Sequence, residues 1–97
     1  MRIGRSLGID RGKKVKEAFD SNKEKFGFID VTAEELAQIE PLATPPGGRN
    51  STRTDVYAFT AGAWMVVIAS FDYGIRISLI NPYYPSDGTE FSVLVAS

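Results

Sequence analysis

The sequence contains neither cysteine nor histidine among its 97 residues. Without cysteine the chain forms no disulfides, binds no metal through thiolates and has no cysteine nucleophile. Without histidine it lacks the commonest general base and metal ligand, and no Ser-His-Asp triad can form within it. Any catalysis would rely on carboxylates, serines, tyrosines or lysines, and we expect neither a cofactor nor a metal.

An excess of one charge and a long apolar run are also missing. Eleven basic and 12 acidic residues give a net charge of −1, which makes no global case for binding nucleic acid or an anionic membrane. The longest apolar run, Ala61–Ala69, is less than half of the roughly 20 residues of a membrane-spanning helix. Arg2 and Arg5 are not followed by the apolar stretch of a signal peptide. We therefore expect a cytoplasmic protein with no membrane partner.

A chain of 10.6 kDa is the size of one small domain with one core. We assign residues 1–97 to a single domain, with a helical half over 1–43, a linker loop over 44–54 and an antiparallel sheet over 55–97. The linker carries two prolines and two glycines in a polar run, which is incompatible with periodic structure.

The first half has the apolar spacing of helices. Val15 and Phe19 belong to an apolar stripe that predicts a helix from about Arg11 to Phe26. We expect Asp10 to cap its N-terminus and Gly27 to end it in the left-handed conformation.

A second, shorter helix is marked by its first turn. Residues 32–35, Thr-Ala-Glu-Glu, form a capping box, in which the Thr32 and Glu35 side chains satisfy each other's backbone amides. Val31 and Leu36 occupy the hydrophobic-staple positions around it. Pro41 is expected to stop this helix near Glu40.

The second half predicts strands, which are rich in β-branched and aromatic residues. The expected strands are Asp55–Thr60, Ala63–Ser70, Ile75–Ile80 and Glu90–Ala96. Their short connections favour antiparallel neighbours. The predicted fold class is α+β, with two N-terminal helices packed on one face of a three- to four-stranded antiparallel β-meander.

One predicted strand is apolar on both of its faces. Residues 63–69 read Ala-Trp-Met-Val-Val-Ile-Ala, although a sheet with one solvated face should alternate apolar and polar residues. Two short helices cover only one face. The other face needs a homo-oligomer, a partner protein, closure into a small barrel, or cover by residues 45–54 or the first ten residues. We favour an interaction surface.

Two sets of residues are candidates for binding a partner. The sheet supplies Tyr57, Phe59, Trp64, Ile80 and Leu94. The second set is the loop over 81–88, where two prolines stiffen a segment that carries Tyr83 and Tyr84. If Trp64 lies beneath the helices, Met65 and Val67 take its place, and the sequence does not choose between these registers.

A nucleic-acid interface and an enzyme active site are the alternatives. A basic N-terminal arm, which includes Arg2, Arg5 and Lys13, could bind phosphates, but acidic residues share the helix face with Lys13. A helix-turn-helix fails because its second helix is acidic. The carboxylates at positions 72, 87 and 90 flank predicted loops, but they show no metal-binding spacing and suit turns equally well.

The sequence therefore predicts a small non-enzymatic protein–protein interaction module, such as an inhibitor, an adaptor or a homo-oligomeric assembly subunit. Its partner would be another protein or copies of itself. Two alternatives stay open: a nucleic-acid-associated protein that uses the basic arm, and a small carboxylate-dependent enzyme.

Overall fold

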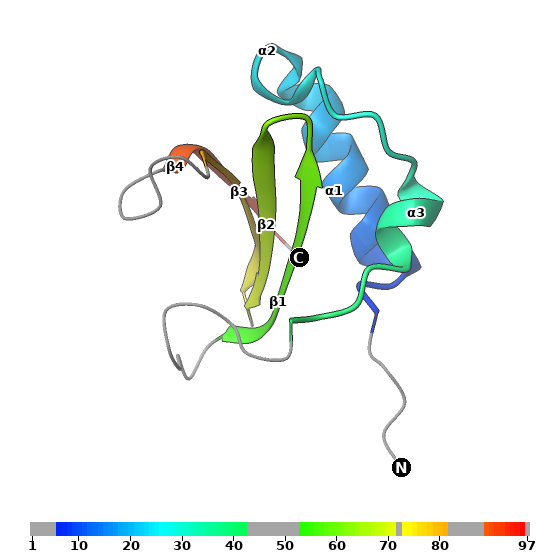
Figure 1. Ribbon diagram of the computed structural model, residues 1–97. Coiled ribbons are helices and arrows are strands. Elements are labelled where there is room, and N and C mark those ends of the chain that lie inside the picture. Colours follow the sequence, from blue (N-terminus) through cyan, green and yellow to red (C-terminus); the bar gives the residue numbers. More distant parts are fainter. Residues whose placement is uncertain (1–5, 43–52, 72, 82–88, 97) are drawn as a thin grey trace.

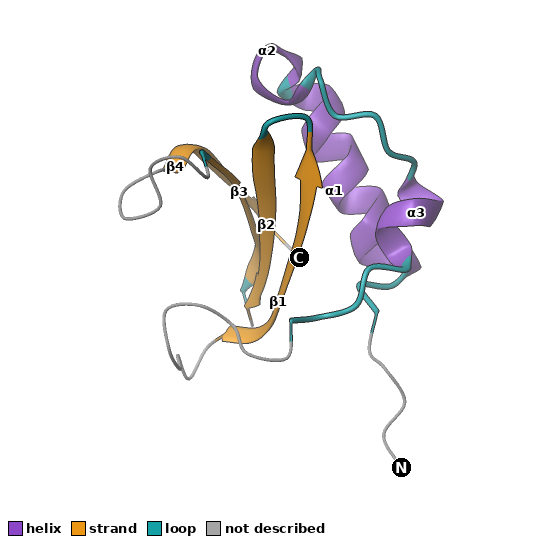
Figure 2. Ribbon diagram, viewed as in Figure 1, coloured by secondary structure: helices purple, strands orange, loops and turns teal. Residues whose placement is uncertain are grey.

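Three helices precede a four-stranded antiparallel sheet, which confirms the predicted α+β class (Figures 1 and 2). The computed structural model describes residues 6–42, 53–71, 73–81 and 89–96. The helices are α1 (Ile9–Ser21), α2 (Lys23–Phe26) and α3 (Ala33–Ala37). The strands are β1 (Arg53–Ala61), β2 (Trp64–Phe71), β3 (Gly74–Ile80) and β4 (Thr89–Ala96).

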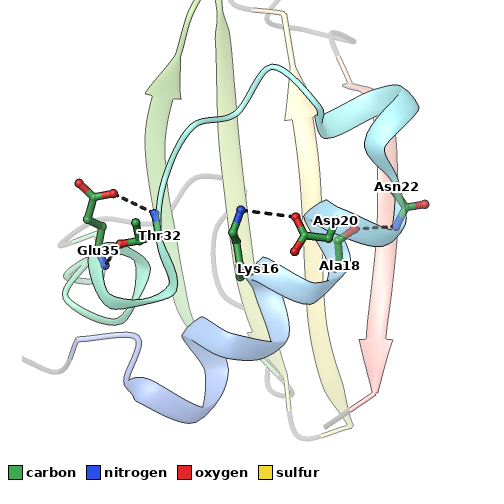
Figure 3. Close-up of polar contacts among 6 residues, drawn as sticks. All are labelled: Lys16, Ala18, Asp20, Asn22, Thr32 and Glu35. Atoms are coloured by element: carbon green, nitrogen blue, oxygen red, sulfur yellow. Dashed lines mark hydrogen bonds and ion pairs between the residues drawn. The ribbon is translucent and has the colours of Figure 1, made fainter.

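The predicted first helix is divided into α1 and α2 at Asn22. Asn22 has φ −121° and ψ 49°, and its side-chain Nδ2 donates a hydrogen bond to the Ala18 carbonyl at 2.9 Å (Figure 3). A side chain that bonds the preceding turn competes with the helical backbone pattern, which explains the break. The prediction for Gly27 was wrong, because this residue has φ −64°.

The start of α1 also differs from the expectation. Gly8, with φ 94°, occupies the N-cap position, and no side chain caps the helix there. The Gly8 N–H donates to the Ala37 carbonyl at 2.9 Å, while the Gly8 carbonyl accepts from Gly12 N–H. The tertiary bond to Ala37 thus determines where the chain turns into α1, and glycine tolerates the required positive φ.

The capping box of α3 forms as predicted (Figure 3). The Glu35 N–H donates to Thr32 Oγ1 at 3.1 Å, and the Thr32 N–H donates to Glu35 Oε1 at 2.8 Å. The helix ends at Ala37, three residues before the predicted end. The Gln38 and Ile39 amides donate to carbonyls three residues back, so the last turn tightens before Pro41 is reached.

The sheet has the strand order β1-β2-β3-β4, with every neighbouring pair antiparallel. Gly62 and Ala63 join β1 to β2 in a two-residue turn between the paired residues Ala61 and Trp64. Gly62 has φ 60°, whereas no non-glycine residue in the described part of the chain has a positive φ. This pattern is the one that a type II′ hairpin turn requires.

The helices cover one face of the sheet (Figure 1). One buried cluster joins Val15, Phe19, Phe26 and Leu36 from the helical half to the sheet. The buried members from the sheet are Tyr57, Val66, Ile68, Ile75, Ile77 and Leu79. The two halves that differ in composition therefore share one hydrophobic core.

Candidate functional site

The face of the sheet opposite the helices is the candidate interaction surface. Side chains alternate between the two faces of a strand, so the register assigns every second residue to this side. We call it the open face. Its described side chains are Val56, Ala58, Thr60, Met65, Val67, Ala69, Phe71, Arg76, Ser78, Ile80, Ser92 and Leu94.

Accessibility varies across the open face, where Thr60, Arg76, Ser92 and Leu94 are the exposed described residues. Val56, Ala69 and Phe71 form a small buried cluster of their own, and Val67 packs against it. Met65 and Ile80 are half-buried. Leu94 on β4 is 57% exposed. The part of this face near β4 is therefore the part that a partner reaches without displacing other residues.

Arg76 carries the only charge among the described side chains of the open face. It is exposed on β3, and its cross-strand neighbours are Ala69 on β2 and Leu94 on β4. No ion pair joins it to another described residue. The positive charge of Arg76 thus has apolar cross-strand neighbours and no acidic partner in the described part of the chain.

Two aromatic rings lie beside this charge. The Arg76 guanidinium carbon is 5.2 Å from the centroid of the Phe71 ring, within the range of a cation–π interaction. The exposed Tyr73 ring, in the turn between β2 and β3, stacks on Phe71 with centroids 5.2 Å apart and planes inclined by 19°. These contacts hold the guanidinium against the sheet, so its direction is restricted before any partner binds.

The residues predicted to bind a partner are divided between the two faces. Tyr57, Phe59 and Trp64 lie on the helix-covered face, where Tyr57 is completely buried. Ile80 and Leu94 lie on the open face, on neighbouring strands. Tyr83 and Tyr84 lie outside the described residues. Of the described candidates, only Ile80 and Leu94 lie on the open face.

The register explains this division. Trp64 pairs with Ala61 on the helix-covered face, and Met65 and Val67 lie on the open face. This is the alternative register considered from the sequence. The large rings of Tyr57 and Trp64 join the core on the helix side, where Phe26 and Phe28 supply further aromatic surface. Tyr57 is too deeply buried to contact a partner without unfolding of the core around it.

The group formed by Arg76, Phe71 and Tyr73 was not predicted from the sequence. Residues 71–74 were predicted as a break between two strands, where Asp72 was also considered as an active-site carboxylate. A signal was nevertheless present, because Phe71 ends one strand and Arg76 follows two residues after Gly74 in the next. In a hairpin that pairs Phe71 with Gly74, the period of two places Phe71 and Arg76 on the same face.

The structure provides little for the two alternative functions. Arg2, Arg5, Asp72 and Asp87 lie outside the described residues, as does the Glu90 side chain. On α1, Lys16 Nζ lies 3.4 Å from the Asp20 carboxylate, so an acidic group neutralises this basic residue (Figure 3). Over the described ranges, no three acidic side chains are grouped to hold a metal ion, and no helix has the length and apolar character to cross a membrane.

Comparison with known proteins assigns no family. No protein-family model, curated protein or solved structure matches the chain.

Proposed function

We propose that the chain is a small non-enzymatic protein–protein interaction module that binds another protein through the open face. An inhibitor, an adaptor and an assembly subunit are all consistent with this activity. The proposal is carried by the exposed Leu94 together with Arg76, which forms no ion pair with a described residue, on a sheet face that no described helix covers.

The chemistry of the open face defines the partner. Half-buried Met65, Val67 and Ile80 lie on the same face as Leu94, with Arg76, Ser78 and Ser92 between them and Leu94. These apolar residues favour apolar side chains opposite them. Arg76 favours a carboxylate, because a guanidinium binds carboxylate oxygens through charge-assisted hydrogen bonds. The expected partner surface therefore presents an acidic group beside aliphatic or aromatic side chains.

The same charge disfavours face-to-face association of two copies. A two-fold axis through the exposed part of the open face would bring two Arg76 side chains together, and no acidic residue among its described side chains would compensate for them. Arginine is, by contrast, among the residue types enriched at interfaces between different proteins. Tyr83 and Tyr84, predicted as a second contact, remain part of the proposal.

A matched pair of charge substitutions tests the proposal. Leu94→Lys places a charge on the open face, whereas Ile9→Lys makes the same kind of change at an exposed aliphatic residue of α1. Wild type and both variants are used as immobilised baits in an extract of the source cells, with circular dichroism as the folding control. We expect one protein to be captured by wild type and Ile9→Lys and lost with Leu94→Lys.

The affinity of the captured protein for the Arg76→Gln variant is the second measurement. If the partner carries a carboxylate opposite Arg76, this variant should weaken its binding by about tenfold or more, since a buried charged contact is worth on the order of 2 kcal/mol. Binding that is unchanged in both Leu94→Lys and Arg76→Gln would refute the open face as the binding surface.

A further inference from the structure

The strand β4 is an edge of the sheet. It pairs with β3 on one side, and no described residue pairs with its other side. The opposite edge, β1, is different: the Leu42 N–H donates to the Val56 carbonyl at 2.7 Å, so the chain that precedes the sheet contacts β1. On β1 this bond occupies one outward carbonyl, whereas no outward N–H or C=O group of β4 is bonded to a described residue.

Most of the common protections of an edge strand are missing from the described part of β4. Natural sheets protect their edges with proline, lysine, inward-pointing charges, bulges or very short strands. The strand is eight residues long and contains neither proline nor lysine. Its described side chains, residues 91–95, are uncharged. The single irregularity in its pairing with β3 lies at the Thr89 end.

The hydrophobic core extends to this edge. Phe91, Val93 and Val95 lie on the helix-covered face of β4 and are only partly buried, although their partners on β3 are fully part of the core. Phe26 contacts the Phe91 ring at a centroid distance of 5.4 Å, and Lys25 Nζ lies 5.8 Å from the same centroid. A strand added beside β4 would cover the remaining apolar surface.

We propose that this added strand is β4 of a second copy, paired antiparallel around a two-fold axis at Val93. A two-fold axis perpendicular to the sheet reverses the strand direction and keeps each side chain on its own face. Paired residues then lie an even number of positions apart in the sequence, so the pairing is centred on a residue and not on a peptide bond. An axis at Val93 overlaps nearly the whole strand. It pairs Val93 with Val93 of the second copy, Phe91 with Val95, and Ser92 with Leu94.

This register is self-complementary. On the helix-covered face it makes one pair of β-branched residues and two pairs of Phe91 with Val95, the kinds of cross-strand pair that stabilise sheets. On the open face it places Ser92 opposite Leu94, without a charge. With a net charge of −1 per chain, the two copies repel each other only weakly.

The dimer would be a continuous eight-stranded sheet with all helices on one face and two joined open faces on the other. Two β4 strands would lie between the two Arg76 side chains. At the usual strand spacing, the distance between these side chains is at least about 14 Å. This distance exceeds the Debye length of roughly 8 Å at physiological salt, so the two charges are screened. The pairing does not depend on what binds the open face.

Light scattering after size exclusion gives the first measurement. We expect a molar mass of twice 10.6 kDa, with dissociation only on dilution and little change with salt. Cysteine substitution then tests the register, because the chain has no native cysteine to confuse the result.

Two exposed residues of the open face allow this test without a change to the core. In the proposed register, Ser92 lies directly opposite Leu94 of the second copy, with Cβ atoms about 4.5–5.5 Å apart, whereas the pairs of identical residues are about 7–8 Å apart. Ser92→Cys and Leu94→Cys chains should therefore form a disulfide when mixed, and each should cross-link poorly alone. The Val93→Cys variant should cross-link to itself.

Each alternative result overturns the proposal. A chain that stays monomeric at several hundred micromolar, with no preferred cross-link, shows that β4 does not pair with itself. If Leu94→Cys alone cross-links faster than the mixture of Ser92→Cys and Leu94→Cys, the dimer associates through the open face and not through β4. The Arg76→Gln arm of the extract experiment tests the open face separately, because Arg76 lies on β3 and not on the paired strand β4.

Discussion

Gly12 of α1 lies against the carbonyl oxygen of Ala33 in α3, where a Cβ atom on Gly12 would be only 2.8 Å from that oxygen. The same Cβ would be 3.1 Å from the Ala37 nitrogen. Both are backbone atoms, so they cannot move aside as a flexible side chain would. The absence of a side chain at position 12 is what allows the two helices to approach so closely.

Gly12→Ala should therefore destabilise the protein, although alanine is the better helix former by about 1 kcal/mol. We expect a net loss of about 1–3 kcal/mol in the free energy of unfolding, because the helices must separate. Urea unfolding followed by circular dichroism measures it. Glu17→Ala, exposed on the same helix, is the control and should change stability by less than about 0.5 kcal/mol. An increase in stability with Gly12→Ala would contradict the close packing of α1 on α3.

Thr32→Ala should remove half of the capping box of α3. The variant leaves the Glu35 N–H without the Thr32 Oγ1 acceptor that it has at 3.1 Å. The expected cost is about 1 kcal/mol, within the usual range for loss of an N-cap. Thermal unfolding measures it, and Thr32→Ser is the control because it keeps the hydroxyl. Equal melting temperatures for Thr32→Ala and Thr32→Ser would show that this hydroxyl does not stabilise the fold.

Arg76 and Phe71 should be energetically coupled. The guanidinium carbon lies 5.2 Å from the ring centroid at an exposed site, where such a contact is worth about 0.5–1 kcal/mol. A double-mutant cycle with Arg76→Ala and Phe71→Leu isolates this energy from the separate losses of packing. Urea unfolding of the four proteins gives the coupling. A value near zero would mean that the aromatic group does not hold the guanidinium on the open face.

Ile77 and Leu94 should respond differently to the same truncation. Ile77 on β3 is completely buried beneath the helices, whereas Leu94 on β4 is exposed on the open face. Ile77→Ala should cost about 2–5 kcal/mol of stability because it leaves a cavity. Leu94→Ala should cost no more than about 0.5 kcal/mol. The comparison is made at a protein concentration where the chain is monomeric, so that loss of a contact between copies does not contribute. A large loss with Leu94→Ala in the monomer would mean that the open face is covered by the chain itself.

Much of the fold could be predicted from the sequence because its signals are local. The capping box at Thr32 and Glu35 depends on residues three positions apart, and the structure forms both of its hydrogen bonds. The strands were located to within two residues at each end, because each is a β-branched or aromatic run bounded by turn residues. The helix ends were less accurate. The Asn22 side chain interrupts one helix, and a hydrogen bond from Gly8 to Ala37 determines where α1 begins.

The candidate site was predicted only in part. Ile80 and Leu94 were assigned to the surface opposite the helices, where the structure places them. Tyr57, Phe59 and Trp64 were included as well, and they belong to the helix-covered face. The contact of Arg76 with Phe71 was not foreseen, because it needs the exact pairing of β2 with β3.

The order of helices and strands, the strand positions and the lack of cysteine and histidine chemistry all follow from residues close together in the chain or from composition. Tertiary structure alone decided which face of the sheet became the core. Residues 63–69 are apolar on both sides, so alternation within β2 favours neither face, and a shift of one residue exchanges them. Packing against Phe26 and the other helix residues resolved this choice: it buried Tyr57 and left Leu94 and Arg76 exposed on the opposite face.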